Sequence, residues 1–550
     1  MIETVRVFTA LSEEFVELFF KHHPVSATEA GIHDYDHLMP DDSPDGLRER
    51  AAWLRDLEQR LAASVPWDEL PVEPRVDYAL LRSRIAALRA DLEEIKVGQK
   101  TPALYLLRAF NSIHLLLSRS FAPLDERKEA AVARLMALPD YLDSAKANLK
   151  QVPLLLRETG MELAALGPGF VDDVVRTLLR QFPGEAERLE HAGSRARSGF
   201  LRVHDFLAKD QRPHAEGTFA IGERWMNYKL EREHLLPFTC SELERIGREN
   251  MSHARIQLEA EAKRLDPART WRELVAEGKQ RTPEPHWLRD AYVAEMERAR
   301  QFVVDRKLAP LSPGERLEIV DTPMFERSLA PFAMYQPPAP FDADQTGFFY
   351  VTPIDLRRTK EEQAQQLAGH CTPSLPVIAL HEAYPGHHLQ LCHANRAATR
   401  LRKIASSDLF AEGWALYCED LMWEQGFFTS DPWTRLFQLR DLLWRACRVV
   451  IDAGLHSGRM TFDEAVDLLV SEAMLERVHA VAEVKRYAMT PTQPMSYLIG
   501  KLQILDLRDE AQKKLGSRFN LHDFHAALLA SGTIPPALVR EELWARLGTA

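Results

Sequence analysis

Cysteine is scarce in this chain of 550 residues. The sequence has only five, and no two of them form a Cys-x-x-Cys pair. A sparse set with an odd number of members excludes a scaffold held together by disulfides. The simplest setting for the protein is therefore a reducing cytoplasm, and we expect a cytoplasmic location.

Long apolar runs and an excess of positive charge are missing as well. No stretch approaches the roughly 18 uncharged apolar residues of a transmembrane helix. The first residues, 1–6, lack the basic start and the apolar core of a signal peptide. The 69 Lys and Arg residues are outnumbered by 81 Asp and Glu, which gives a net charge of −12. Because phosphate binding needs a basic face, we do not expect nucleic acid as a partner. The lack of a long apolar run likewise leads us to expect no membrane partner.

Glycine is sparse too, with 25 residues in 550, whereas helix-forming Ala, Leu, Glu and Arg are abundant. Apolar residues recur with helical spacing over 126–150 and over 240–264, where Thr239 is a candidate N-cap. Strand patterns are few, and the clearest are 317–320 and 347–352. The sequence therefore predicts a mainly α protein with a small β-sheet.

The most informative segment is 380–388, which reads Leu-His-Glu-Ala-Tyr-Pro-Gly-His-His. It resembles the HExxH helix of zinc peptidases. In that motif two histidines at i and i+4 bind zinc, and the glutamate beside the first is the general base. Here Pro385 and Gly386 stand before the next histidine. The pattern predicts a metal ligand at His381 and a base at Glu382.

A regular helix would not bring these histidines together. At about 100° per residue, His381 and His387 are about 600° apart and face different sides, and His388 is aligned with His381 but about 10.5 Å further along the axis. Pro385 cannot bond the carbonyl of His381, and Gly386 relaxes the backbone, so a kink can return His387 toward His381. Either His387 or His388 remains eligible as the second ligand. A kinked helix with surface histidines is the alternative to a metal site.

A third ligand is expected downstream, because catalytic zinc usually takes three protein ligands. Ser407 or Asp408 can cap a helix in which Glu412 lies one turn in, flanked by apolar residues. A buried carboxylate needs a partner, and a metal is a good one. The alternative is a carboxylate favoured by the helix dipole. Glu419, seven residues on, shares the face of Glu412 and is placed to support a histidine ligand.

Further short motifs are spread along most of the chain. They are Pro24-Val25-Ser26-Ala27-Thr28, Gly31-Ile32-His33-Asp34-Tyr35-Asp36, Glu412-Gly413-Trp414-Ala415-Leu416-Tyr417, Asp452-Ala453-Gly454-Leu455-His456, Arg486-Tyr487, Pro491-Thr492-Gln493, Ser496-Tyr497, Gly500, Phe524-His525 and Gly532. Together with 381–388, they resemble the bacterial family catalogued as domain of unknown function 885, in the wider group of gluzincin-type metallopeptidases. More distantly, the chain resembles the carboxypeptidase Taq, angiotensin-converting and dipeptidyl peptidase III families, the last of which also carries an insert in its zinc motif.

This resemblance implies one large unit, 1–550, although length alone suggests three or four domains at about 100–200 residues each. The implied fold has many helices in two lobes around a deep cleft, with the small sheet near the active site. We expect an N-terminal helical lobe over 1–215 and a catalytic lobe over 216–550.

The resemblance also implies a zinc-dependent metallopeptidase that hydrolyses short peptides. His381, His387 and Glu412 are the implied Zn²⁺ ligands. Glu382 takes a proton from a water that the metal activates. Two alternatives remain open: a specialised metal-dependent amide hydrolase for a small metabolite or peptide-like natural product, and a non-catalytic helical binding protein. The sequence leaves the position of cleavage and the oligomeric state open.

Similar peptidases stabilise the oxyanion with a histidine and a tyrosine from C-terminal helices. The candidates here are His456, Tyr487 and Tyr497, with Asp452 placed to orient His456. Which tyrosine acts is left open. Arg486 is either a carboxylate-binding group or an exposed helix charge.

Overall fold

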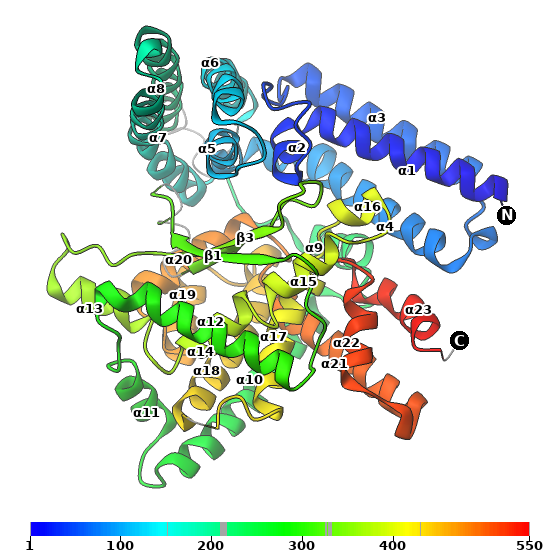
Figure 1. Ribbon diagram of the computed structural model, residues 1–550, viewed down its shortest axis with the longest axis vertical. Coiled ribbons are helices and arrows are strands. Elements are labelled where there is room, and N and C mark those ends of the chain that lie inside the picture. The colour runs from blue at the N-terminus through cyan, green and yellow to red at the C-terminus, as the bar shows by residue number, and fades with distance from the viewer. Residues whose placement is uncertain are drawn as a thin grey trace. The chain divides into compact units, whose positions relative to one another are not determined.

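The structure is a computed structural model that describes residues 2–150, 152–209, 217–324, 327, 333–429 and 431–548 (Figure 1). Its contacts divide the chain into two compact units. Unit 1 comprises Met1–Phe219 and Ala339–Asp344, and unit 2 comprises Ala220–Pro338 and Gln345–Ala550. The fold is mainly α with one small sheet, as the sequence predicts. The deep cleft between two lobes stays a prediction.

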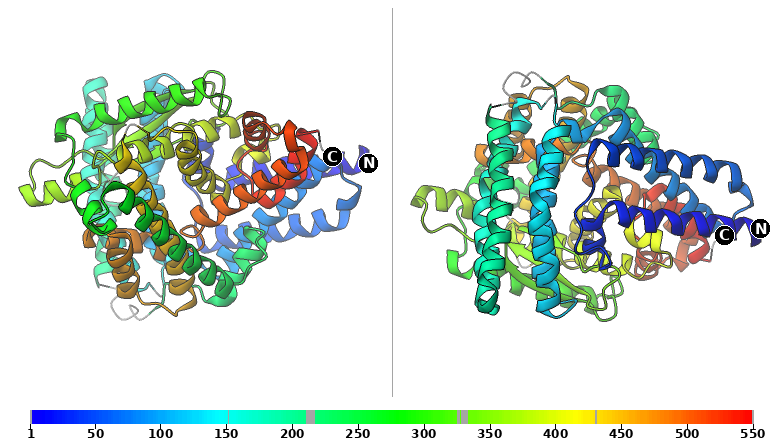
Figure 2. Two further views of the ribbon diagram at one scale, coloured as in Figure 1. Left: turned by 90° about the horizontal axis from the view of Figure 1, so that it is seen from below. Right: turned by 90° about the horizontal axis from the view of Figure 1, so that it is seen from above.

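The regular structure described in unit 1 is helical. Its α-helices are α1 (Ile2–His22), α2 (Pro24–Ala30), α3 (Pro44–Ser64), α4 (Val72–Arg89), α5 (Pro102–Ser118), α6 (Leu124–Asn148), α7 (Leu154–Gln181) and α8 (Ala186–Lys209). The helix predicted over 126–150 is α6. Helices α6, α7 and α8 lie side by side, and α8 packs on both of the others (Figures 1 and 2).

A buried guanidinium holds the N-terminal motifs of unit 1 together. Arg134 on α6 is completely buried. It donates hydrogen bonds to the carbonyls of Leu38, Ser112 and Pro24 and to the hydroxyl of Thr28. Since a buried charge is tolerated only when its donors are satisfied, this cluster accounts structurally for Thr28.

Residues 339–344, from the connection that follows β2 (Ala333–Gln336), belong to unit 1 rather than to unit 2. The Phe341 amide donates to the carbonyl of Ala30 at 3.0 Å. The imidazole of His33 lies between two carboxylates, with Nδ1 2.8 Å from Asp36 and Nε2 3.0 Å from Asp342. The sequence motif around His33 therefore ties a distant segment into unit 1.

Unit 2 contains the remaining helices. They are α9 (Glu223–Tyr228), α10 (Cys240–Leu265), α11 (Trp271–Gly278), α12 (Leu288–Asp305), α13 (Lys360–Ala368), α14 (Leu375–Glu382), α15 (His387–Ala394), α16 (Arg400–Ile404), α17 (Asp408–Glu424), α18 (Pro432–Ser457), α19 (Phe462–Ala473), α20 (Arg477–Met489), α21 (Ser496–Leu515), α22 (Leu521–Leu529) and α23 (Pro536–Arg546). The predicted cap at Thr239 begins α10, in a capping box with Glu242. Among the described residues, every helix is too short or too polar to span a bilayer.

A three-stranded sheet completes unit 2. Its order is β1 (Arg316–Asp321), β3 (Thr346–Val351), β2. Strands β1 and β3 are parallel, with Arg316 opposite Thr346, and β2 is antiparallel to β3, with Ala333 opposite Val351. The strands predicted over 317–320 and 347–352 are β1 and β3, whereas β2 was not predicted.

Helices α17 and α21 cross with their backbones in contact. A Cβ atom on Gly500 would lie 1.8 Å from the carbonyl oxygen of Leu409, and one on Gly413 would lie 2.4 Å from the carbonyl carbon of Gly500. Both positions therefore require glycine. The crossing brings the helix that carries Glu412 against the helix that begins at Ser496.

Candidate metal centre

The motif at 381–388 is broken into two helices at the point where the sequence predicts a kink. Helix α14 ends at Glu382, and α15 begins at His387. The Tyr384–Pro385 peptide bond between them is cis. A Cβ atom on Gly386 would lie 1.8 Å from the carbonyl oxygen of His381, so this turn requires glycine.

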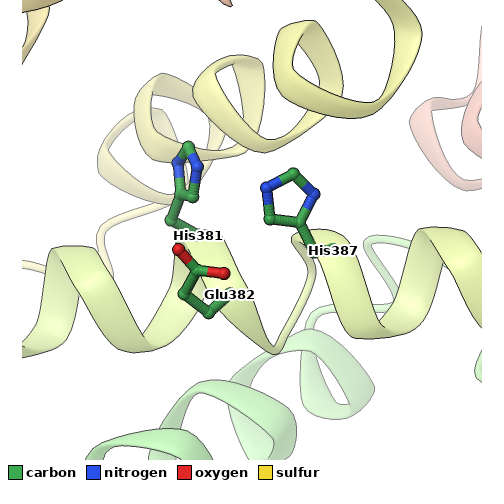
Figure 3. Close-up of side chains that lie close together, drawn as sticks. All are labelled: His381, Glu382 and His387. Atoms are coloured by element: carbon green, nitrogen blue, oxygen red, sulfur yellow. The ribbon is translucent and has the colours of Figure 1, made fainter. Parts of the chain in front are cut away.

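The break brings His381, Glu382 and His387 together (Figure 3). One nitrogen or oxygen atom from each side chain lies within 4.8 Å of the other two. The two imidazole centroids are 4.9 Å apart, with ring planes at 86°. Both histidines are buried. This is the arrangement that a regular helix excludes, and the Pro-Gly insert makes it possible.

Glu412 on α17 completes the cluster. Its Oε2 atom lies 3.1 Å from Nε2 of His387 and 3.6 Å from Nε2 of His381. This oxygen is buried, yet neither contact has the geometry of a hydrogen bond. Glu412 Oε2 therefore lies within 3.6 Å of a nitrogen on each imidazole, and nitrogen and oxygen atoms of these kinds ligate zinc.

The charges of this cluster are strongly coupled. Burial raises the pKa of Glu412, but the neighbouring imidazoles of His387 and His381 outweigh burial and hold this pKa well below its usual range. Burial lowers the pKa of His381, and the nearby carboxylates of Glu412 and Glu419 raise it to about 9. The imidazoles and the carboxylates of this cluster therefore stabilise one another's charged forms.

Glu419 supports His381 from behind, as its spacing from Glu412 predicts. Its side chain is fully buried, and Oε1 lies 2.9 Å from Nδ1 of His381. When Nδ1 donates this hydrogen bond, the Nε2 lone pair is left facing Glu412 and His387. A histidine that binds a metal through one ring nitrogen commonly donates its other ring N–H to such a carboxylate.

Glu382 lies beside the two imidazoles, with its carboxylate directed toward them (Figure 3). Burial raises the pKa of Glu382, and the charges of His387 and His381 oppose that shift. The side chain is partly exposed. A carboxylate in this position can exchange a proton with a water in the cluster.

His388, the alternative second ligand, is directed elsewhere. It is fully buried. Its Nε2 lies 2.7 Å from Glu315 Oε2, and its Nδ1 lies 2.9 Å from the hydroxyl of Tyr335. The hydroxyl of Tyr384 donates to the same Glu315 oxygen at 2.5 Å. His388 therefore fastens the motif to the sheet region, and the geometry favours His387 as the ligand. Neither Glu315 nor Tyr335 belongs to a pattern that could have identified it from the sequence.

Comparison with known proteins places the chain in a family. The model of a bacterial protein family of unknown function, DUF885, matches residues 24–543. The chain belongs to the DUF885 family. The matched residues of this DUF885 protein include every member of the cluster described above.

Two solved structures share the fold of this DUF885 protein. One, from Shewanella oneidensis, is described provisionally as a lipoprotein of unknown function; it is 22% identical, the match covers 97% of this chain and 98% of that one, and the TM-score is 0.79. The other, from Colwellia psychrerythraea, is described provisionally as a lipoprotein; it is 18% identical, the match covers 100% of both chains, and the TM-score is 0.85. No curated protein sequence matches this chain. A cytoplasmic location stays a prediction.

The oxyanion role predicted for His456 does not fit the geometry of this DUF885 protein. His456 is fully buried, and its Nε2 donates to the carbonyl of Tyr487 at 3.0 Å. Asp452 does not orient it either, because its nearest oxygen is 3.9 Å away and accepts the Thr492 amide, while its other oxygen accepts the Met495 amide. Asp452 instead holds the loop before α21, and His456 bonds a carbonyl near the end of α20. Sequence spacing alone does not show which backbone groups need such partners.

The two candidate tyrosines have different environments. The hydroxyl of Tyr487 is fully engaged: it accepts from Arg448 at 2.7 Å and from Trp444 at 3.2 Å, and it donates to Glu483 at 2.7 Å. Tyr487 is therefore a structural residue, contrary to the oxyanion role considered for it. The ring of Tyr497 lies 6.2 Å from the ring of His381, nearly parallel to it. Tyr497 is the tyrosine that the fold places beside the cluster.

A glutamine that spacing did not single out also contacts the cluster. Nε2 of Gln493 donates to Oε1 of Glu412 at 3.4 Å. Gln493 follows the Thr492 amide that Asp452 holds. The sequence feature that could have identified Gln493 is its place in the short motif Pro491-Thr492-Gln493.

Proposed function

We propose that this DUF885 protein is a zinc-dependent hydrolase that cleaves the peptide bonds of short peptides. The observation that carries the proposal is the convergence of two Nε2 atoms, from His381 and His387, on Oε2 of Glu412, at 3.6 and 3.1 Å. Two imidazoles and one carboxylate are a recurrent ligand set of catalytic zinc, with a further position left for water or substrate.

The residues present fit that ion. The Glu412 oxygen is buried and lacks a hydrogen bond, as a ligand atom without its cation would. When bound, zinc supplies a Lewis acid that polarises the carbonyl and lowers the pKa of a water. Glu419 fixes the ring orientation of His381 and leaves its Nε2 free to ligate.

The chain's own groups then move the protons. Glu382 accepts a proton from the attacking water and delivers it to the leaving amine, which is the role of a positioned carboxylate. The raised pKa of Glu382, caused by burial, suits this exchange. Tyr497 donates a hydrogen bond to the oxyanion that develops on the carbonyl.

Metal analysis and a peptide screen test the proposal together. We expect stoichiometric zinc in the purified protein and its loss in His381→Ala, His387→Ala and Glu412→Gln. His253→Ala is the matched control, because His253 is an exposed residue of α10. Glu382→Gln should keep the zinc and lose roughly 10²- to 10⁴-fold in turnover.

The screen separates the possible outcomes. Cleavage of many short peptides, lost in Glu382→Gln, is the expected result. Stoichiometric zinc without cleavage of any peptide would contradict the proposed substrate class. A protein that binds no zinc would overturn the metal centre itself.

A further inference from the structure

Two arginines of neighbouring helices share one carboxylate beside the candidate metal centre. Arg448 on α18 and Arg486 on α20 each donate from Nη2 to Glu483 Oε2, at 2.9 and 2.8 Å. Arg486 also donates from Nη1 to Gln493 at 3.1 Å, and Gln493 donates to Glu412. A continuous chain of hydrogen bonds thus connects Arg486 to the proposed zinc ligand.

The charges in this arginine pair are not balanced. Burial raises the pKa of Glu483, but the two guanidinium groups lower it to about 2, so Glu483 is ionised at neutral pH. Two positive charges therefore face one negative charge. Asp408 also interacts with Arg486, but burial raises its pKa to about 7, so it is only partly ionised there. The negative charge of Glu412 would be offset by zinc in the proposed centre. The pair retains up to one positive charge for a ligand.

The two arginines differ in what they can reach. Arg448 is 4% exposed, and its guanidinium lies 4.5 Å from the ring of Trp444 and 4.3 Å from the ring of Tyr497. It is fixed within the protein. The side chain of Arg486 is 25% exposed. A guanidinium has five N–H donors, and among the described residues Arg486 uses Nη1 and Nη2 for Gln493 and Glu483. Donors therefore remain for a ligand.

We propose that Arg486 binds a free carboxylate of the substrate close to the bond that is cleaved. This inference rests on the proposed function, and it narrows the substrate class to peptides that carry a carboxylate near that bond. A guanidinium binds a carboxylate through paired, charge-assisted hydrogen bonds, and Glu483 and Gln493 hold Arg486 in place for it. The carboxylate is either the C-terminal group of the peptide or an acidic side chain.

Binding to zinc-loaded Glu382→Gln protein tests the inference without relying on turnover. Three ligands are titrated by calorimetry: a short peptide that the wild type cleaves, its C-terminal amide, and the amide with Asp as its last residue. We expect the free acid to bind roughly 10- to 100-fold more tightly than the amide. Arg486→Gln should remove that difference, and Arg486→Lys should restore part of it.

The control is Arg477→Gln, on the same helix, because Arg477 is exposed and pairs with Asp467. It should leave the preference for the acid unchanged. Zinc content and melting temperature are measured for each variant to show that it is folded and loaded. The comparison of free acid with amide in the Glu382→Gln parent tests the inference even if the Arg486 variants do not fold. Recovery of tight binding by the Asp-containing amide would identify a side-chain carboxylate as the ligand.

Two failures are distinguishable. If the wild type cleaves peptides but acid and amide bind equally, the inference about Arg486 is wrong and the proposed function stands. If the zinc-loaded wild type cleaves no peptide, the proposed function and this inference both fail.

Discussion

The ring of Tyr497 lies over the imidazole of His381, with the centroids 6.2 Å apart and the planes 16° from parallel. The guanidinium of Arg448 lies on the same phenol ring, 4.3 Å from its centroid. Tyr497 is therefore held between a proposed zinc ligand and a fixed positive charge. Burial and the negative charge of Glu412 raise the pKa of Tyr497 and outweigh the opposing effect of Arg448, so the hydroxyl keeps the proton that it would donate.

Replacing Tyr497 with Phe should lower kcat by roughly 10²- to 10³-fold, the usual effect of losing one oxyanion donor. KM and zinc content should stay nearly unchanged. The matched variant is Tyr487→Phe. Because that hydroxyl bonds Arg448 and Glu483 inside the protein, its loss should lower the melting temperature. Equal kcat in Tyr497→Phe and wild type would remove Tyr497 from the mechanism.

Glu419→Gln should weaken zinc binding by roughly 10- to 100-fold, because the carboxylate that orients His381 and raises its basicity is lost. Competition with a chelator of known affinity measures this change. Glu424→Gln is the control on the same helix, since Glu424 pairs with Arg508 at 2.8 Å on a partly exposed surface. An unchanged zinc affinity in Glu419→Gln would mean that this hydrogen bond does not contribute to metal binding.

Gly386→Ala should disrupt the cluster, because the new Cβ atom would lie 1.8 Å from the carbonyl oxygen of His381. The turn would have to open, which separates His387 from His381. We expect loss of zinc as well as a lower melting temperature. Gly169→Ala is the control: Gly169 lies within α7, its new Cβ would meet nothing within 4 Å, and alanine favours the helix. Normal zinc binding by Gly386→Ala would contradict the described turn.

The stability of unit 1 should fall in mildly alkaline solution. Burial lowers the pKa of His33, but the hydrogen bonds to Asp342 and Asp36 raise it to about 9. Its ordinary pKa is about 6.5. The charged pairs therefore contribute fully below pH 6.5, and this contribution is lost as the pH rises through 9. Thermal unfolding of wild type and His33→Gln, measured from pH 6 to pH 10, should converge toward the alkaline end. A constant difference between the two would contradict the assignment.

Periodicity and capping patterns were sufficient for much of the helical fold. Thr239 and Glu242 mark the beginning of α10, and the Pro-Gly insert marks the break between α14 and α15. Such features depend on neighbours in the chain. Strand β2 was missed because its four residues are all half-buried and show no alternation.

The choice among candidate residues depended on distant partners. His387 and His388 are adjacent, and what separates their roles is Glu315, which lies 73 positions from His388 in the sequence. Tyr487 and Tyr497 were equivalent on spacing, and the contacts of Tyr487 with Arg448 and Trp444 distinguish them. One sequence does not contain that information.

Assigning 339–344 to unit 1 has a consequence for synthesis on the ribosome. Residues 1–219 emerge first, but the peptide that carries Phe341 and Asp342 follows only after 220–338. At about 5–20 residues per second, the ribosome needs roughly 6 to 24 s to add these intervening residues. During that interval His33 lacks one of its two carboxylate partners, Asp342. Unit 1 can therefore be completed only after a segment that lies within the sequence range of unit 2 has been synthesised.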